Sequence, residues 1–240
     1  MSELLPGIEN RLKSVRDRFT QAIHEAHRSA DDVLLIAVGK TFPVDALEQV
    51  WALGQRHFGE NYVLEGVGKV EYFATKHPED KPIWHFIGPL QSNKTRLVAE
   101  HFDWVHSIDR LKIAQRLSEQ RPDTMPALNV LIEVNVSGEA TKSGVTPDEV
   151  PLLAQAIAGL PRLVLRGLMA IPEPTSDVTE QRATFKKMKD LFERLSKDYP
   201  QFDTLSMGMS ADMESAILEG ATMVRVGSAI FGARDYSNKK

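Results

Sequence analysis

Apolar residues recur along this chain in two patterns: a stripe with helical spacing in the opening segment, and a series of short unbroken runs after it. The stripe predicts an N-terminal helix that packs on a larger body. Its members are Ile8, Leu12, Val15, Phe19, Ile23 and Ala26. The short runs are typical of buried strands and lie at 33–40, 56–60, 83–88, 104–108, 128–136, 163–171, 204–208 and 223–231. Helical patterns separate them, so the chain alternates between strand and helix.

This alternation predicts an α/β fold in which parallel strands are joined by right-handed crossovers. Eight such units match a single closed (β/α)8 TIM barrel, here with an extra N-terminal helix. An open doubly wound sheet is the alternative. Because no linker, low-complexity tract or shift in composition divides the chain, we expect one domain over 1–240, with residues 1–30 forming the helix that packs on the barrel.

Composition narrows the class of ligand. The 240 residues are 42% hydrophobic and 26% charged, which is ordinary for a globular protein. The formal net charge of -4 argues against non-specific binding to nucleic acid or to an anionic membrane. We therefore expect a small molecule as the partner.

Cysteine is absent, which excludes disulfides, thiolate metal sites and a cysteine nucleophile. The first seven residues lack the basic and apolar regions of a secretory signal, and no apolar run reaches membrane-spanning length. These features predict a cytoplasmic protein that uses no metal.

Lys40 closes the first apolar run and precedes Thr41-Phe42-Pro43, which cannot continue a strand. Catalytic and binding residues of such barrels lie at the carboxyl ends of the strands. Burial at that place would favour the neutral amine that a Schiff-base lysine needs. From this segment alone, a lysine that has left the barrel and extends into water is the more ordinary interpretation.

Other strand ends carry polar residues as well. Asn61 follows the second run, and Glu133 and Asn135 share one face of the fifth by period-two alternation. The last two either shape the site or form an internal hydrogen-bonded pair. His85, late in the third run, is a minor candidate, whereas His106 is interpreted as an ordinary core or surface histidine.

The last two units indicate a phosphate site. Ser210 is predicted to cap a helix that runs to Gly220, presenting free backbone N–H groups and a positive dipole end to an anion. Gly227 lets a ligand approach the backbone, and Ser228 offers another donor. The loops after strands seven and eight often bind phosphate in this fold. Arg225 either pairs with a carboxylate or reaches the ligand, and Met209 either packs in the core or borders the ligand.

Six strings closely resemble the pyridoxal phosphate homeostasis protein family. They cover residues 37–41, 58–62, 84–94, 166–169, 206–213 and 225–232, in order along almost the whole chain. The resemblance implies a fold-type-III barrel like the N-terminal domain of alanine racemase, with pyridoxal 5′-phosphate as an internal aldimine on Lys40. It also implies that Ser210, Gly227 and Ser228 bind the phosphate and that Asn61 lines the ring.

By the same resemblance, Arg225 would face the pyridine nitrogen or, as the alternative, the phosphate. An arginine there would keep that nitrogen unprotonated and make the ring a weak electron sink. Gly39 departs from the family, which often has serine before the lysine; the lost hydroxyl would tune the site without removing the aldimine. A barrel of this size leaves no room for the second, β-rich domain that completes the site of alanine racemase-like enzymes.

We therefore expect a monomeric pyridoxal phosphate carrier without established turnover, which buffers the cofactor or delivers it to apo-enzymes and so affects amino-acid and vitamin B6 metabolism. Two alternatives remain. One is an enzyme with weak amino-acid racemase-type activity, and the other is an aldolase that uses Lys40 directly on a phosphorylated sugar. Lys142, a loop lysine, is a candidate for a second cofactor site.

Overall fold

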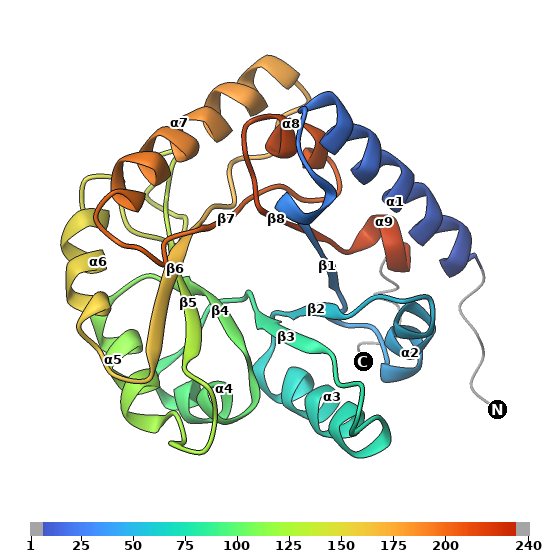
Figure 1. Ribbon diagram of the computed structural model, residues 1–240, viewed down its shortest axis with the longest axis horizontal. Coiled ribbons are helices and arrows are strands. Elements are labelled where there is room, and N and C mark those ends of the chain that lie inside the picture. Colours follow the sequence, from blue (N-terminus) through green and yellow to red (C-terminus); the bar gives the residue numbers. More distant parts are fainter. Residues whose placement is uncertain (1–6, 234–240) are drawn as a thin grey trace.

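A closed barrel of eight parallel strands forms the centre of the molecule, as the computed structural model of residues 7–233 shows (Figure 1). The strands are paired in chain order, and the first also pairs with the last, from Leu34 against Met223 to Ala37 against Val226. This closing pair confirms the predicted barrel and rules out the open doubly wound sheet.

All eight predicted strands are present, but most end earlier than the apolar runs do. They are β1 Leu34–Val38, β2 His57–Glu60, β3 Ile83–Phe86, β4 Trp104–Ile108, β5 Leu128–Glu133, β6 Leu163–Met169, β7 Thr204–Ser206 and β8 Met223–Val226. The carboxyl-terminal residues of most runs instead form loops at one mouth of the barrel. The loops at that mouth are therefore as apolar in sequence as the strands that precede them.

The predicted strand 223–231 was wrong in its second half, because residues Ser228–Phe231 form the short helix α9. Ile230 and Phe231 are buried there, and helix α1 lies beside them. A short apolar run fits a buried helix turn as well as a buried strand, so periodicity alone could not separate the two.

Helices surround the barrel in Figure 1. They are α1 Ile8–Glu25, α2 Val44–Ala52, α3 Val63–Lys76, α4 Thr95–His101, α5 Leu111–Gln120, α6 Val150–Ala158, α7 Val178–Ser196, α8 Met213–Leu218 and α9, with 3-10 turns η1 Ala30–Asp32 and η2 Ser92–Lys94. Each crossover helix buries one apolar face against the outside of the sheet, which is the arrangement that right-handed βαβ units produce.

The extra helix α1 packs along α8 and α9 (Figure 1). Its predicted stripe is largely buried, with Ile8, Leu12 and Val15 each at most 4% exposed. Two arginines tie it to the last β/α units: Arg11 Nε donates to the Ile230 carbonyl at 2.9 Å, and Arg18 bonds to both carboxylate oxygens of Glu214. The helix thus supports the region that carries the last two strand ends.

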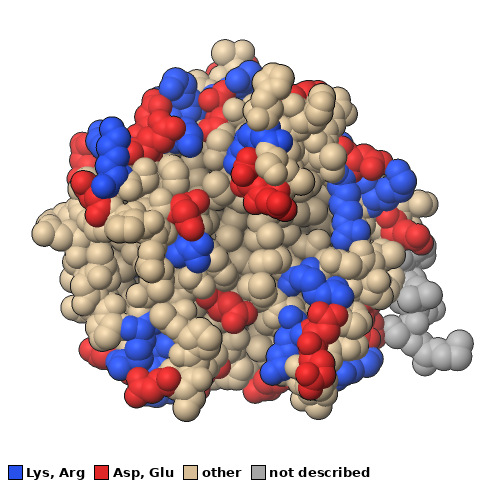
Figure 2. All heavy atoms as spheres, viewed as in Figure 1, with Lys and Arg blue, Asp and Glu red and all other residues tan. Residues whose placement is uncertain are grey.

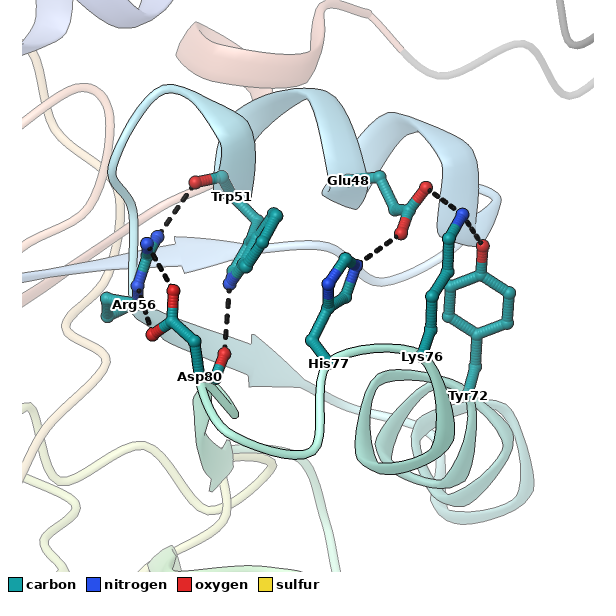
Figure 3. Close-up of polar contacts among 7 residues, drawn as sticks. All are labelled: Glu48, Trp51, Arg56, Tyr72, Lys76, His77 and Asp80. Atoms are coloured by element: carbon teal, nitrogen blue, oxygen red, sulfur yellow. Dashed lines mark hydrogen bonds and ion pairs between the residues drawn. The ribbon is translucent and has the colours of Figure 1, made fainter.

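Helices α2 and α3 are joined on their outer side by a group of polar and aromatic contacts (Figure 3). Glu48 of α2 accepts from Lys76 Nζ at 2.8 Å and lies 2.7 Å from His77 Nε2. The Trp51 ring stacks on His77 with centroids 3.9 Å apart, and its indole N–H donates to the Asp80 carbonyl. These contacts hold the carboxyl-terminal end of α3 against α2.

Acidic and basic side chains are interspersed over the face of the molecule shown in Figure 2, and neither sign gathers into one large patch there. In the described part of the chain, no helix is long and apolar enough to cross a membrane.

Candidate functional site

One cavity of about 490 Å³ at the carboxyl ends of the strands collects every residue that the sequence singled out for cofactor binding. These are Lys40, Asn61, Met209, Ser210, Arg225, Gly227 and Ser228. Val38, Ile87 and Ile171 add apolar walls. Residues 188 positions apart in the sequence thus meet at the mouth of the barrel because β1 and β8 are neighbours.

A second cavity, of about 580 Å³, lies at the amino ends of the strands and is lined by Arg28, Arg166 and Asp203 among others. Its two arginines are already engaged: Arg166 bonds to Asp203 at 2.8 Å, and Arg28 donates to the carbonyls of Ile217 and Ala221. We therefore place the functional site at the carboxyl ends.

Lys40 lies in a turn rather than inside a strand. The β1 ladder continues one residue past Val38, where the Gly39 amide donates to the Gly59 carbonyl, and the chain then turns as the Phe42 amide donates back to the Gly39 carbonyl. Lys40 is half-buried and lines the cavity. The strand end and the turn together bring its side chain to the cavity wall.

Ser210 and Ser228 face one another at the other side of the cavity, with their hydroxyl oxygens 3.4 Å apart. Gly227 lies beside them. A β-carbon at position 227 would lie 3.2 Å from the Val38 carbonyl oxygen, so a larger residue would crowd the end of β1. Two hydroxyls and an open stretch of backbone make this the part of the cavity suited to phosphate oxygens.

The prediction that Ser210 caps a helix was wrong. Helix α8 begins at Met213, three residues later, and is only six residues long. The Asp212 carboxylate accepts from the Met209 amide at 2.7 Å, which folds residues 209–212 into a turn. Aspartate competes well for nearby backbone N–H groups in this way. Ser210 therefore reaches the cavity from a turn, and the helix-dipole argument does not apply to it.

Arg225 is 3% exposed and projects from β8 into the barrel. Its guanidinium donates to the Ser206 hydroxyl at 2.5 Å and to the Ala170 carbonyl at 3.0 Å. Burial lowers its pKa to about 10, and the charges of Asp212 and Glu133 oppose that shift. Both hydrogen-bond partners are neutral, so of the two alternatives for Arg225 the structure favours the one in which the cation faces the cavity.

A chain of hydrogen bonds continues from Arg225 through the barrel interior. His106 Nδ1 lies 2.9 Å from the Ser206 hydroxyl, His85 Nδ1 lies 2.9 Å from His106 Nε2, and His57 Nδ1 lies 2.9 Å from His85 Nε2. Arginine can only donate, so the Ser206 oxygen accepts from Arg225 and keeps one proton and one lone pair for His106 Nδ1. Because each contact between two histidines joins Nδ1 of one ring to Nε2 of the next, all three neutral imidazoles carry their proton on the same ring nitrogen.

Burial lowers the pKa of His85 and His106 well below the ordinary value and that of His57 to about 4. All three histidines are therefore neutral near pH 7. From the sequence, His85 was a minor candidate and His106 an ordinary core or surface histidine, whereas His57 and Ser206 were not singled out. Their signal was present, because each is a polar residue inside an apolar strand segment, yet only the closed barrel shows that they touch.

The fifth strand differs from the expectation. β5 ends at Glu133, and Asn135 belongs to the following loop, where its amide donates to the Glu139 carbonyl. The two residues do not share a strand face or form a pair. Glu133 remains in the barrel, where burial and the nearby Asp109 raise its pKa to about 7 while Arg225 lowers it.

Lys142, the candidate for a second site, lies in the loop after β5. Its Nζ is 3.3 Å from Glu139 Oε1, and it does not line the cavity that contains Lys40. No second cofactor site is indicated by these contacts.

Comparison with known sequences gives a consistent picture. The family model described as "Alanine racemase, N-terminal domain" matches residues 15–235. A protein of Vibrio cholerae named "Pyridoxal phosphate homeostasis protein" is 56% identical over 231 residues, which are 96% of this chain and 98% of that protein. The protein of the same name from Escherichia coli K12 is 54% identical over 232 residues, or 97% of this chain and 99% of that one.

Solved structures agree with these relatives. PipY of Synechococcus elongatus, solved with PLP bound, is 35% identical with a TM-score of 0.79, covering 94% of this chain and 100% of that one. An alanine racemase of Clostridium difficile, in complex with cycloserine, is 13% identical with a TM-score of 0.71, covering 92% of this chain and 60% of that one. The second likeness shows the barrel fold alone.

Proposed function

Because this chain belongs to the pyridoxal phosphate homeostasis protein family, we propose that it holds pyridoxal 5′-phosphate (PLP) on Lys40 and takes part in the homeostasis of that cofactor. The membership confirms the resemblance seen in the sequence. The observation that carries the proposal is the single cavity in which an amine, a buried cation and a pair of hydroxyls face a common space.

The residues present fit the cofactor. PLP is an anionic aromatic aldehyde, so it needs an amine, apolar walls for the ring and donors for the phosphate. Lys40 supplies the amine, Val38 and Ile87 supply walls, and Ser210 and Ser228 supply hydroxyl donors. Asn61 Oδ1 is buried and has no hydrogen-bond partner among the described residues, which leaves it available to a ligand in this cavity.

We assign the roles from the positions around the cavity and from the family resemblance. Lys40 would attach PLP through its amine, and Asn61 would border the ring. Ser210, Ser228 and the backbone at Gly227 would bind the phosphate, with Met209 packing at the edge. Arg225 would lie near the ring nitrogen; a guanidinium can only donate, and its bonds to Ser206 and Ala170 hold it in place. When bound, PLP supplies an electrophilic carbonyl carbon and an electron sink.

Arg225 also bears on whether the protein turns over amino acids. A buried guanidinium opposes the uptake of a proton by a neighbouring pyridine nitrogen, and an unprotonated ring is a weak electron sink. We therefore propose a carrier rather than an enzyme. In this proposal, a single-domain monomer of residues 1–240 works in the cytoplasm and releases PLP to apo-enzymes.

Reduction of the loaded protein tests the proposal. The purified protein is mixed with PLP, its absorbance is recorded before and after borohydride, and the reduced adduct is mapped by peptide mass spectrometry. We expect one adduct on Lys40, its loss in Lys40→Ala and its retention in Lys142→Ala. Labelling scattered over surface lysines, or a protein that is colourless once free PLP is removed, would refute the proposal and favour an aldolase that uses Lys40 directly.

A further inference from the structure

A second lysine, Lys69 of helix α3, is buried behind Lys40 and does not line the cofactor cavity. Its side chain is 6% exposed and its ammonium group makes three contacts. It donates to the Gly39 carbonyl at 2.8 Å, to Glu60 Oε1 at 2.8 Å and to Glu65 Oε1 at 2.7 Å. All three ammonium protons therefore have an acceptor, and one of those acceptors is the residue before Lys40.

The residue after Lys40 is bound by the same group of side chains. The Thr41 amide donates to Glu65 Oε1 at 2.6 Å, and that oxygen also accepts from Lys69. The Gly39 carbonyl before Lys40 and the Thr41 amide after it are thus both bound by one cluster, which consists of Lys69, Glu60 and Glu65. Rotation of the turn about Lys40 would break both contacts.

Thr41 shows that the turn needs such support. Its φ is +69°, in the left-handed region that β-branched residues rarely adopt. A backbone held in that region costs free energy and persists only where surrounding contacts oppose its relaxation. The hydrogen bond from Thr41 to Glu65 is such a contact, and it lies next to Lys40.

The two helices next to the cluster, α2 and α3, are also held together. Helix α2 follows the Lys40 turn, α3 carries Glu65 and Lys69, and Figure 3 shows the outer contacts that tie the two helices together. Glu48, Lys76 and His77 form that tie at the far end of α3. Lys69 therefore holds the turn against an element that is itself fixed to the helix after the turn.

Electrostatics gives the cluster a second effect on Lys40. Burial raises the pKa of Glu60 to about 7, while the charges of Lys69 and Lys40 act to lower it. Glu60 is thus within electrostatic reach of both lysines. If Lys69 were removed, Glu60 and Glu65 would lose the cation that balances their charge, and unbalanced carboxylates beside Lys40 would favour its charged form.

We propose that Lys69 is a positioning residue for Lys40, which aims the Lys40 amine into the cavity through Gly39, Glu60 and Glu65 and balances the charge of these carboxylates beside it. The inference rests on the proposed function, because it assumes that Lys40 is the residue that attaches PLP.

The test compares Lys69→Met with Lys69→Arg, Glu65→Ala and the control Lys76→Met. The control removes a lysine from the same helix far from the turn and leaves the contacts of His77 with Glu48 and Trp51 to hold α3 against α2. Attachment of PLP is followed by absorbance from pH 6 to 10, and the induced circular dichroism of the bound chromophore reports its fixed orientation. Hydrogen exchange of the Thr41 amide is measured without PLP.

We expect Lys69→Met to attach PLP at least tenfold more slowly at pH 7.5, with a midpoint moved to higher pH and a weaker dichroic signal. Lys69→Arg restores part of the rate, and Lys76→Met behaves as the wild type. Glu65→Ala speeds exchange at Thr41 and slows attachment. Because Glu65 is half-exposed, this variant decides the matter if Lys69→Met does not fold.

The inference would be overturned if Lys69→Met and Glu65→Ala both fold and both attach PLP with the rate and pH profile of the wild type. That outcome differs from failure of the proposed function, in which the wild-type protein itself yields no adduct on Lys40.

Discussion

Two buried cations, Lys69 and Arg225, lie near Lys40, and they differ in the charge of their hydrogen-bond partners. Lys69 is surrounded by two carboxylates and a carbonyl, so its charge is balanced within the protein. Arg225 donates to a hydroxyl and a carbonyl, both neutral, and its remaining charge faces the cavity. The difference teaches that burial alone does not tell whether a cation serves the fold or the ligand; the charge of its partners does.

Removing Lys69 and removing Arg225 should therefore change the free energy of unfolding by different amounts. A buried ion pair contributes little to stability compared with an apolar pair, yet removing one partner leaves an uncompensated charge and costs several kcal/mol. Removing a cation whose partners are neutral leaves only unpaired dipoles, while the cost of burying the charge disappears. The two sites should therefore respond differently to the same substitution.

The largest expected effect is on the fold. Lys69→Met should lower the free energy of unfolding by roughly 3 kcal/mol or more at pH 8, because Glu60 and Glu65 lose their cation. The loss should be smaller at pH 6, where Glu60 takes up a proton more easily. Urea unfolding at the two pH values measures this. An equal loss at both would mean that packing, not charge, was removed, and Lys76→Met provides the baseline.

Next in size is the effect on the ligand. Arg225→Met should weaken PLP binding at least tenfold while destabilising the fold less than Lys69→Met does. The Ser206 hydroxyl and the Ala170 carbonyl each lose a donor, but no carboxylate is in hydrogen-bond contact with Arg225. Equilibrium titration with PLP and urea unfolding of the same sample give both quantities. A variant that unfolds as readily as Lys69→Met and binds PLP normally would reverse the comparison.

The histidine chain attached to Arg225 predicts a pH dependence. The folded pKa of His57, His85 and His106 lies below the unfolded value, so their contribution to stability is complete above about pH 6.5 and is lost as pH falls. Glu60 and Glu133 have raised pKa values and act in the opposite direction between about pH 4.5 and 7. The histidine part is therefore measured as a difference between variants.

His106→Asn keeps a donor and an acceptor but cannot titrate. Between pH 6.5 and 5, its free energy of unfolding should fall less steeply than that of the wild type, by up to about 1.4 kcal/mol per pH unit for one proton. Substitution of His101, at the outer end of α4, is the control. Parallel pH curves for wild type and His106→Asn would contradict the lowered pKa, because they would show that His106 takes up a proton as readily in the folded protein as in the unfolded chain.

The smallest expected effect concerns Gly39, beside the Lys69 cluster. A β-carbon there would lie 2.9 Å from Glu60 Oε1 and from the Leu47 methyl groups, all of which are ends of side chains. Gly39→Ser should therefore cost about 1 kcal/mol and keep the adduct on Lys40. Thermal unfolding and borohydride mapping check this; loss of the adduct would show that the cluster tolerates no movement.

Most of the fold could be read from the apolar pattern. Eight runs predicted eight strands, and the stripe from Ile8 to Ile23 predicted α1. The ends of the strands were misplaced because the loops at the carboxyl mouth are apolar too, as in 228–231. Ser210 was assigned to a helix start because the local contact between Asp212 and Met209 has no clear signature in the pattern.

For the candidate site, the sequence predicted the residues that line the cavity but not the residues behind them. Lys40, Asn61, Ser210, Arg225 and Ser228 each follow or end a strand, so the barrel rule alone brings them to one mouth. The second layer behind them was not predictable in the same way. His106 and Ser206, for example, are 100 positions apart and touch only after closure.

By itself, the sequence determined the strand and helix alternation and the set of residues near the carboxyl ends of the strands, because these follow from local periodicity and from a general rule of connection. It favoured the closed barrel, and the pairing of β1 with β8 decided against an open sheet. Only the tertiary structure decided which buried charges meet which partners. Hydrogen bonds and ion pairs act over about 3 Å and depend on direction, and no spacing along the chain encodes the distance from Lys69 to Gly39 or from Arg225 to the histidines.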